Sequence, residues 1–273
     1  MEEAKNVNKD GFRVAVLASG STGNLTYIET PKRRILVDCG LSGKKAQELL
    51  ASVGRRMEDV DSILVTHEHR DHTHGVGVLA RRFNLDVYAN EKTWKAMAPI
   101  VGDIPLDQCH LIEPGEMQVF SDIDVMSFSV SHDAVDPQFY AFQKDKKRFV
   151  LLTDTGYVSD RLRGLLRGAD AYLIESNHDM ELLRLGPYPW SLKQRILSDE
   201  GHLSNVDGAE AVAEMITDKT KAVYLGHLSQ KNNMKQLAYD TAYQILDEKD
   251  LGPNQAFQLL GTDPDKAQDF LDL

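Results

Sequence analysis

The chain has 273 residues, of which 42% are hydrophobic and 27% charged, as in ordinary globular proteins. No apolar stretch approaches the roughly 20 residues that span a bilayer, so the sequence predicts no membrane insertion. The formal net charge of −11 disfavours nucleic acid as a partner, because phosphates are bound mainly by Lys and Arg. Bound cations would weaken that argument, since they would reverse the sign of the charge close to the site.

The first ten residues, MEEAKNVNKD, lack the basic start and apolar middle of a signal peptide. We therefore expect a cytoplasmic protein, with a flexible segment at 1–10 and one domain over 11–273. Two cysteines, Cys39 and Cys109, are too few for a disulfide framework, so both are expected to be reduced or buried. A metal site would have to be built from histidine and carboxylate.

Short apolar runs, many of them β-branched, alternate with longer amphipathic segments. The runs predict strands at 13–19, 26–29, 34–38, 61–66, 86–89, 118–120, 123–130, 139–143, 148–153, 171–175, 222–225 and 256–260. Helices are predicted at 42–52, 77–83, 91–97, 159–166, 204–216 and 234–247, with Ser42 as the first N-cap. The recurring mixture of strands and helices predicts an α/β fold of two facing sheets with helices outside, a four-layer αββα sandwich.

The segment VTHEHRDHTHG at 65–75 gathers four of the nine histidines, with Asp71 among them. Histidines two positions apart on a strand share a face, so His67 and His69 can bind one ion. Asp71 and His72, on the following turn, can bind a second ion. A solvated histidine-rich loop is the alternative, but this density directly after an apolar strand favours metal binding. Neutral imidazole and carboxylate suit zinc, iron and manganese alike.

This H-x-H-x-D-H motif resembles the signature of the metallo-β-lactamase-fold hydrolases, and further motifs follow in that family's order. They are ILVDCG with Asp38, SVSHDAVDP with His132, LLTDTG with Asp154 and VYLGHLS with His227. Taken singly, the last three are better explained as turn or half-buried residues. Each nevertheless follows a predicted strand, where open α/β sheets place their sites.

The resemblance implies two divalent ions (Zn, Mn or Fe) that share Asp154, with Asp38 orienting the metal loop without binding metal. The first ion would be held by His67, His69, His132 and Asp154, and the second by Asp71, His72, His227 and Asp154. Two ions roughly 3.5–4 Å apart would supply a bridging hydroxide as nucleophile near neutral pH. Asp71 is assigned to catalysis as well as to the metal.

Within this fold, three segments are similar to the YycJ/WalJ-type group: LASGSTGN at 17–24, ESNHD at 175–179 and GHLSN at 201–205. The resemblance implies a phosphodiesterase, most specifically a 5′–3′ DNA exonuclease. The interval between Asp154 and His227 leaves no room for the second domain of β-CASP nucleases. The sequence also lacks an obvious extended arm of the kind that tRNase Z uses, which favours DNA or small phosphodiesters over tRNA.

His202 resembles the second-sphere histidine of tRNase Z-like phosphodiesterases, which implies that it protonates the leaving oxygen or holds the phosphate. A cap-region histidine without a catalytic role is the alternative. Ser204 begins a predicted helix whose free N–H groups suit an anion, and His178 follows a strand, so both are predicted substrate contacts. A hydrogen-bonded turn explains His178 equally well.

Two other functions compete with the phosphodiesterase. One is a carboxylic ester, thioester or lactone hydrolase of the same fold, and the other is a metal-containing regulatory partner in cell-wall signalling. His202 and the lack of a secretion signal favour phosphate chemistry, and the full ligand set favours an enzyme. The basic residues at 144–148 and 161–167 are explained as solvated surface, without a DNA groove.

Overall fold

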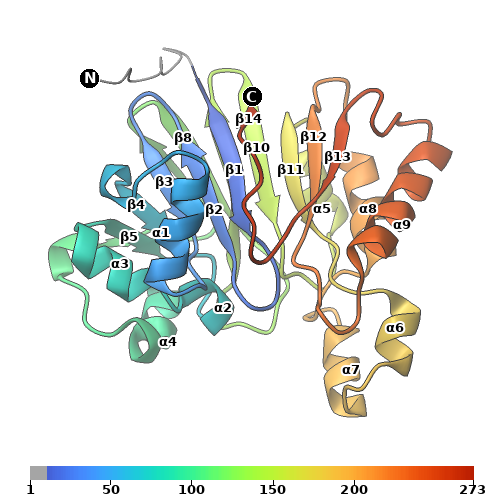
Figure 1. Ribbon diagram of the computed structural model, residues 1–273, viewed down its shortest axis with the longest axis horizontal. Coiled ribbons are helices and arrows are strands. Elements are labelled where there is room, and N and C mark those ends of the chain that lie inside the picture. Colours follow the sequence, from blue (N-terminus) through green and yellow to red (C-terminus); the bar gives the residue numbers. More distant parts are fainter. Residues whose placement is uncertain (1–10) are drawn as a thin grey trace.

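The computed structural model describes residues 11–273, so the prediction for residues 1–10 lies outside them. Two sheets pack face to face and carry helices on their outer sides, which confirms the four-layer arrangement (Figure 1). The first sheet has the order β14–β1–β2–β3–β4–β5–β6. Its strands are β1 (Arg13–Ala18), β2 (Leu25–Glu29), β3 (Arg34–Val37), β4 (Ser62–Leu64), β5 (Asp86–Ala89), β6 (Cys109–Leu111) and β14 (Leu271–Asp272).

The second sheet has the order β13–β12–β11–β10–β9–β8–β7. Its strands are β7 (Met117–Phe120), β8 (Ile123–Ser129), β9 (Gln138–Lys144), β10 (Lys147–Leu152), β11 (Ala171–Glu175), β12 (Ala222–Gly226) and β13 (Gln258–Gly261). Strands β10, β11, β12 and β13 are parallel, as are β3, β4, β5 and β6. Parallel strands end at a common edge, and the loops that carry the histidine and aspartate motifs leave from that edge.

Helices cover the outer face of each sheet (Figure 1). Those on the first sheet are α1 (Gly43–Ser52), α3 (Val76–Phe83) and α4 (Glu91–Val101), and those on the second are α5 (Asp160–Leu166), α8 (Asn205–Met215) and α9 (Lys235–Glu248). Ser42 caps α1 as predicted, because its side chain accepts a hydrogen bond from the Lys45 N–H at 3.3 Å. Among residues 11–273, no helix combines the length and the apolar character needed to cross a bilayer.

The core divides into two clusters. One fills the space between the sheets and under α8 and α9, and includes Phe139, Phe142 and Tyr172. The other lies between the first sheet and its own helices. Two 3-10 turns, Met57–Asp59 and Leu106–Gln108, lead into strands of the first sheet. Burial on both faces explains why strands such as β10 and β11 are almost continuously apolar.

Three helices at the edge of the sheets are absent from the predicted elements: α2 (Arg70–Thr73), α6 (Met180–Leu185) and α7 (Trp190–Ile196). Helices this short are marginal by themselves and depend on tertiary contacts, so periodicity gives little sign of them. The short strands β6 and β14 are also absent from the prediction. All three helices lie around the common edge at which the strands end (Figure 1).

Candidate metal centre

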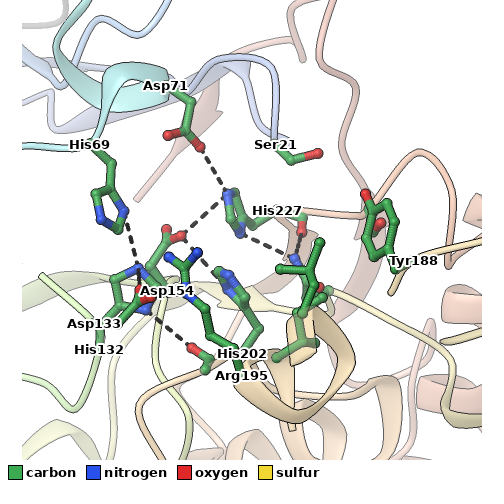
Figure 2. A pocket seen from close by; sticks show the side chains of 15 residues that line it. Ser21, His69, Asp71, His132, Asp133, Asp154, Tyr188, Arg195, His202 and His227 are labelled. Atoms are coloured by element: carbon green, nitrogen blue, oxygen red, sulfur yellow. Dashed lines mark hydrogen bonds and ion pairs between the residues drawn. The ribbon is translucent and has the colours of Figure 1, made fainter. Parts of the chain in front are cut away.

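A cavity of about 320 Å³ opens at this edge, between the loops of the two sheets. Figure 2 shows its polar side, where imidazole and carboxylate groups from distant parts of the chain point toward one another. The groups on this side are those of His69, Asp71, His132, Asp154, His202 and His227. His67 and His72 lie behind them and are fully buried.

Three of the predicted site residues have an unusual backbone conformation. Asp38, Asp154 and His227 have φ angles of 59°, 46° and 55°, in the left-handed region. Non-glycine residues adopt this region uncommonly, and functional sites are where such conformations concentrate. Each residue follows a buried strand, β3, β10 or β12, so the sharp change of direction turns its side chain toward the other loops.

His67, His69 and His132 form a triangle of nitrogens. The Nδ1 atom of His69 lies 3.1 Å from Nε2 of His67 and 3.3 Å from Nε2 of His132. A tetrahedral zinc ion with bonds of about 2.0–2.1 Å sets its ligand nitrogens about 3.3 Å apart. The triangle therefore fits one ion without rearrangement, which matches the first predicted site.

The other ring nitrogens of His67 and His132 are held by the protein. His132 donates its Nδ1 hydrogen to the Gly201 carbonyl oxygen at 3.1 Å, and Nδ1 of His67 lies 3.0 Å from the Thr66 hydroxyl. Such contacts fix the ring orientation and leave Nε2 for a metal. Burial lowers the pKa of both His67 and His132, so these imidazoles are neutral and able to bind a cation.

A second group of donors surrounds Asp154. Its Oδ1 lies 3.3 Å from His227 Nε2, and its Oδ2 lies 3.3 Å from His72 Nε2. Asp71 Oδ2 completes the group, 3.5 Å from His227 Nε2 and 3.7 Å from His72 Nε2. Asp154 Oδ2 is buried, and among residues 11–273 no donor makes a well-aligned hydrogen bond to it, although His72 Nε2 forms an ion pair with it. A cation that replaces the His72 proton would satisfy this oxygen more fully.

The charges of this second group also fit a cation. Burial alone would lower the pKa of His227, but Asp154, Asp71 and Glu175 outweigh it and raise the pKa to about 10. Burial likewise opposes a charge on His72, and Asp154, Asp38 and Asp71 raise its pKa well above the usual value. Protons on the two histidines thus balance the carboxylates, and metal ions would displace those protons on binding.

Asp38 lies behind the histidine cluster rather than in the cavity. Its Oδ2 accepts a hydrogen bond from His72 Nδ1 at 2.8 Å and from the Thr66 hydroxyl at 2.9 Å. Its Oδ1 accepts from the Thr66 N–H at 2.8 Å. The Asp38 carboxylate therefore links Thr66, which follows β4, to His72 in the HEHRDH segment. It also directs His72 Nε2 toward Asp154.

Glu175, at the end of β11, is a site residue that the sequence analysis did not single out. Its Oε1 accepts hydrogen bonds from Nδ1 of His202 at 2.8 Å and of His227 at 2.9 Å. Its Oε2 accepts from the N–H groups of Thr155 and Leu203, at 3.1 and 3.0 Å. Burial would raise the pKa of Glu175, but His202 and His227 outweigh it and lower the pKa to about 2. The signal in the sequence that could have indicated Glu175 is an acidic residue at the end of the apolar run AYLIE.

His202 stands beside the metal donors, between His132 and His227, with ring centroids 5.0 and 5.3 Å away. Because Glu175 occupies Nδ1, Nε2 is the nitrogen that can act on a bound molecule. Burial would lower the pKa of His202, yet Glu175 and Asp154 together raise it. His202 is therefore set to carry a proton at the edge of the cavity.

The two predicted substrate contacts, His178 and Ser204, are buried beside the cavity rather than exposed in it. They pair in an isolated β-bridge and are 1% and 2% exposed, and neither is among the residues that line the cavity. Ser204 caps α8: its hydroxyl accepts from the Asp207 N–H at 3.1 Å and donates to the Asp207 carboxylate at 2.6 Å. In the sequence, a helix start beside the site looks the same whether its cap faces substrate or the protein interior.

Comparison with known families agrees with the fold. The sequence model of the β-lactamase superfamily domain matches residues 33–228, a span that runs from β3 to the residue after His227. The chain therefore belongs to the β-lactamase superfamily, and its facing sheets and paired donor groups make it a metallo-β-lactamase-fold protein.

Two curated relatives narrow the assignment. The chain is 58% identical to exodeoxyribonuclease WalJ of Streptococcus pneumoniae, over 94% of this chain and 96% of that protein. It is 54% identical to exodeoxyribonuclease YycJ of Bacillus anthracis, over 93% and 96%. Within the superfamily the chain is a member of this WalJ/YycJ group, as the sequence motifs predicted.

Solved structures show the same fold at low sequence identity. YhfI from Bacillus subtilis, a metallo-β-lactamase-fold protein, superposes with a TM-score of 0.72 at 15% identity, covering 95% of this chain and 99% of YhfI. Zinc-bound PqqB from Methylobacterium extorquens superposes with a TM-score of 0.68 at 12% identity, covering 94% and 99%.

Proposed function

We propose that this protein is a metal-dependent exodeoxyribonuclease that hydrolyses phosphodiester bonds at a DNA end, in the 5′–3′ direction. The observation that carries the proposal is the Glu175–His202 pair, which lies directly beside two converging sets of metal donors. Similarity to relatives named exodeoxyribonucleases, over nearly the whole chain, supports DNA as the substrate.

Two divalent ions fit the donors. One would be held by His67, His69, His132 and Asp154, and the other by Asp71, His72, His227 and Asp154. When bound, such ions polarise the phosphodiester and activate water for attack. Imidazole and carboxylate donors accept zinc, manganese or iron. The protein holds four of the histidine donors from behind. Asp38 contacts His72, Thr66 contacts His67, the Gly201 carbonyl contacts His132 and Glu175 contacts His227.

His202 would deliver the proton that the leaving oxygen needs. A sugar alkoxide is a poor leaving group, so its departure requires a general acid within reach. Glu175 fixes the ring by Nδ1 and favours the protonated form, which keeps Nε2–H directed into the cavity. The same acid is far less necessary for a carbon ester whose leaving group departs unaided, which favours phosphodiester chemistry.

A net charge of −11 does not prevent binding of DNA at such a site. Two divalent ions at the base of the cavity would reverse the local sign, and charges more than about 8–10 Å away are screened at physiological salt. We propose the cytoplasm, where DNA is available, as the site of action.

The proposal is tested with purified protein, supplied separately with zinc, manganese and iron(II), on linear DNA labelled at either end. A closed circular single strand of the same sequence is the control. Progressive release of mononucleotides from linear DNA, with the circle intact, is expected. Cleavage of the circle would identify an endonuclease. Hydrolysis of nitrocefin or acyl thioesters without attack on DNA would identify a carbon ester hydrolase.

A further inference from the structure

The cavity has a second wall that the metal donors do not explain. Helices α6 and α7 and the loop between them project beyond the edge of the second sheet (Figure 1). Three apolar or aromatic side chains from this hairpin, Tyr188, Leu192 and Ile196, line the cavity. Tyr188 stands on the side of the cavity away from His69 (Figure 2).

Two of these residues share one face of α7, because positions 192 and 196 are four apart on that helix. Tyr188 lies in the loop just before α7 and lines the same cavity. Ile196 is buried, whereas Tyr188 and Leu192 are partly exposed. The cavity thus has a polar wall of metal donors, while the hairpin adds an aromatic ring and an aliphatic surface. The hairpin also contributes Arg195, which is ion-paired with Asp133.

The loop that carries Tyr188 is held in a fixed position. The Lys193 side chain is only 8% exposed, and its Nζ donates to the carbonyl oxygens of Arg184 and Gly186, at 2.7 and 2.8 Å. A Cβ at Gly186 would lie 2.5 Å from Asn232 Oδ1, so the chain runs against its neighbour there. A buried ammonium bound to two carbonyl groups makes a defined wall rather than a loose loop.

A cation also lies close to the aromatic ring. The Lys231 Nζ is 5.8 Å from the centre of the Tyr188 ring, a cation–π contact that helps to hold the ring in place. The cavity volume of about 320 Å³ is at the lower end of the roughly 300–1,000 Å³ range of small-molecule sites. One nucleotide is therefore a better match for this space than a stretch of duplex.

We propose that Tyr188 and Leu192 form the binding wall for the base of the nucleotide at the DNA end, with Tyr188 as a specificity-determining residue. The inference rests on the proposed phosphodiesterase function. With the phosphate at the metal donors, a base that points toward the hairpin would meet Tyr188 and Leu192. Every base presents an aromatic face, so such a wall recognises a nucleoside without selecting its sequence.

The test compares two oligonucleotides that differ only at the end from which the wild-type protein degrades DNA. One ends in thymidine and the other in an abasic tetrahydrofuran residue. Base stacking on an aromatic side chain predicts that kcat/KM for the first step is about 5- to 150-fold higher for the thymidine end. Tyr188→Ala should lower the thymidine rate to the abasic rate, while the abasic rate stays unchanged.

Two further variants keep the test specific. Tyr188→Phe retains the ring and should retain the preference for thymidine. Trp190→Ala removes an aromatic side chain that is 63% exposed on the same hairpin and outside the cavity, and should also retain it. Metal content and melting temperature are measured for each variant to confirm an intact fold.

Equal wild-type rates on the two ends would overturn the inference while leaving the exodeoxyribonuclease function intact. So would an equal loss on both substrates in Tyr188→Ala, because that result marks a general effect on the active site. Failure of the wild-type protein to degrade either oligonucleotide would instead refute the proposed function, and the inference with it.

Discussion

Glu175 Oε1 accepts hydrogen bonds from the Nδ1 atoms of both His202 and His227, at 2.8 and 2.9 Å. One carboxylate thereby orients a metal donor and the proposed proton donor together. Its second oxygen is held by two backbone N–H groups, so the carboxylate cannot turn away from the histidines. The positions of both rings depend on this one side chain.

Replacement of Glu175 by Gln tests this relationship through pH. The negative charge of Glu175 raises the pKa of His202, so its removal should lower that pKa. Because His202 acts in its protonated form, the alkaline limb of the kcat profile on DNA should move to lower pH. Maximal activity should also fall about 10- to 100-fold, as for other groups that orient metal ligands. An unshifted alkaline limb at saturating metal would contradict the role given to Glu175.

His202→Ala separates proton donation from metal binding. On DNA, kcat should fall by about 10²- to 10⁴-fold, the usual contribution of a general acid. On bis-p-nitrophenyl phosphate the loss should be far smaller, because p-nitrophenolate leaves without a proton. Metal content, measured by mass spectrometry of the purified variant, should equal that of the wild-type protein. An equal loss on both substrates would rule out His202 as the acid.

Two substitutions of Asp38 distinguish the negative charge of its side chain from the hydrogen bond that the side chain accepts from Thr66. Asp38→Asn can keep the left-handed φ and the bond from Thr66, but it loses the charge beside His72, so metal affinity should fall about 10- to 100-fold. Asp38→Ala also leaves the buried Thr66 N–H without an acceptor, which should lower the free energy of unfolding by about 1–3 kcal/mol. Chelator competition measures the first effect and urea unfolding the second. Unchanged metal affinity in Asp38→Asn would show that the carboxylate does not tune the metal loop.

Much of this architecture follows from the sequence. The strands that carry Asp38, Asp154 and His227 are continuous apolar runs, and a polar residue directly after such a run marks the edge where sites form. The HEHRDH segment gives the metal donors because its residues are close together in the chain. The strand ends and the HEHRDH segment are therefore local patterns, whereas the family resemblance implied that His132, Asp154 and His227 join that segment in one site.

Glu175 and the α6–α7 hairpin could not be predicted in the same way. Glu175 meets His202 and His227 across 27 and 52 positions of sequence, so no local pattern joins them. The hairpin consists of two short helices around Pro187 and Pro189, and it depends on the buried Lys193 for its shape. Tertiary contacts decide both features, and local propensity is weak for helices of this length.

The central claim, that this chain assembles two metal sites which share Asp154, is tested most directly by metal content. Protein reconstituted anaerobically and freed of excess metal should hold close to two divalent ions per chain. Asp154→Ala should hold at most one and should lose exonuclease activity. Two ions retained in Asp154→Ala, or a wild-type protein that binds fewer than two ions and is still fully active, would contradict the account.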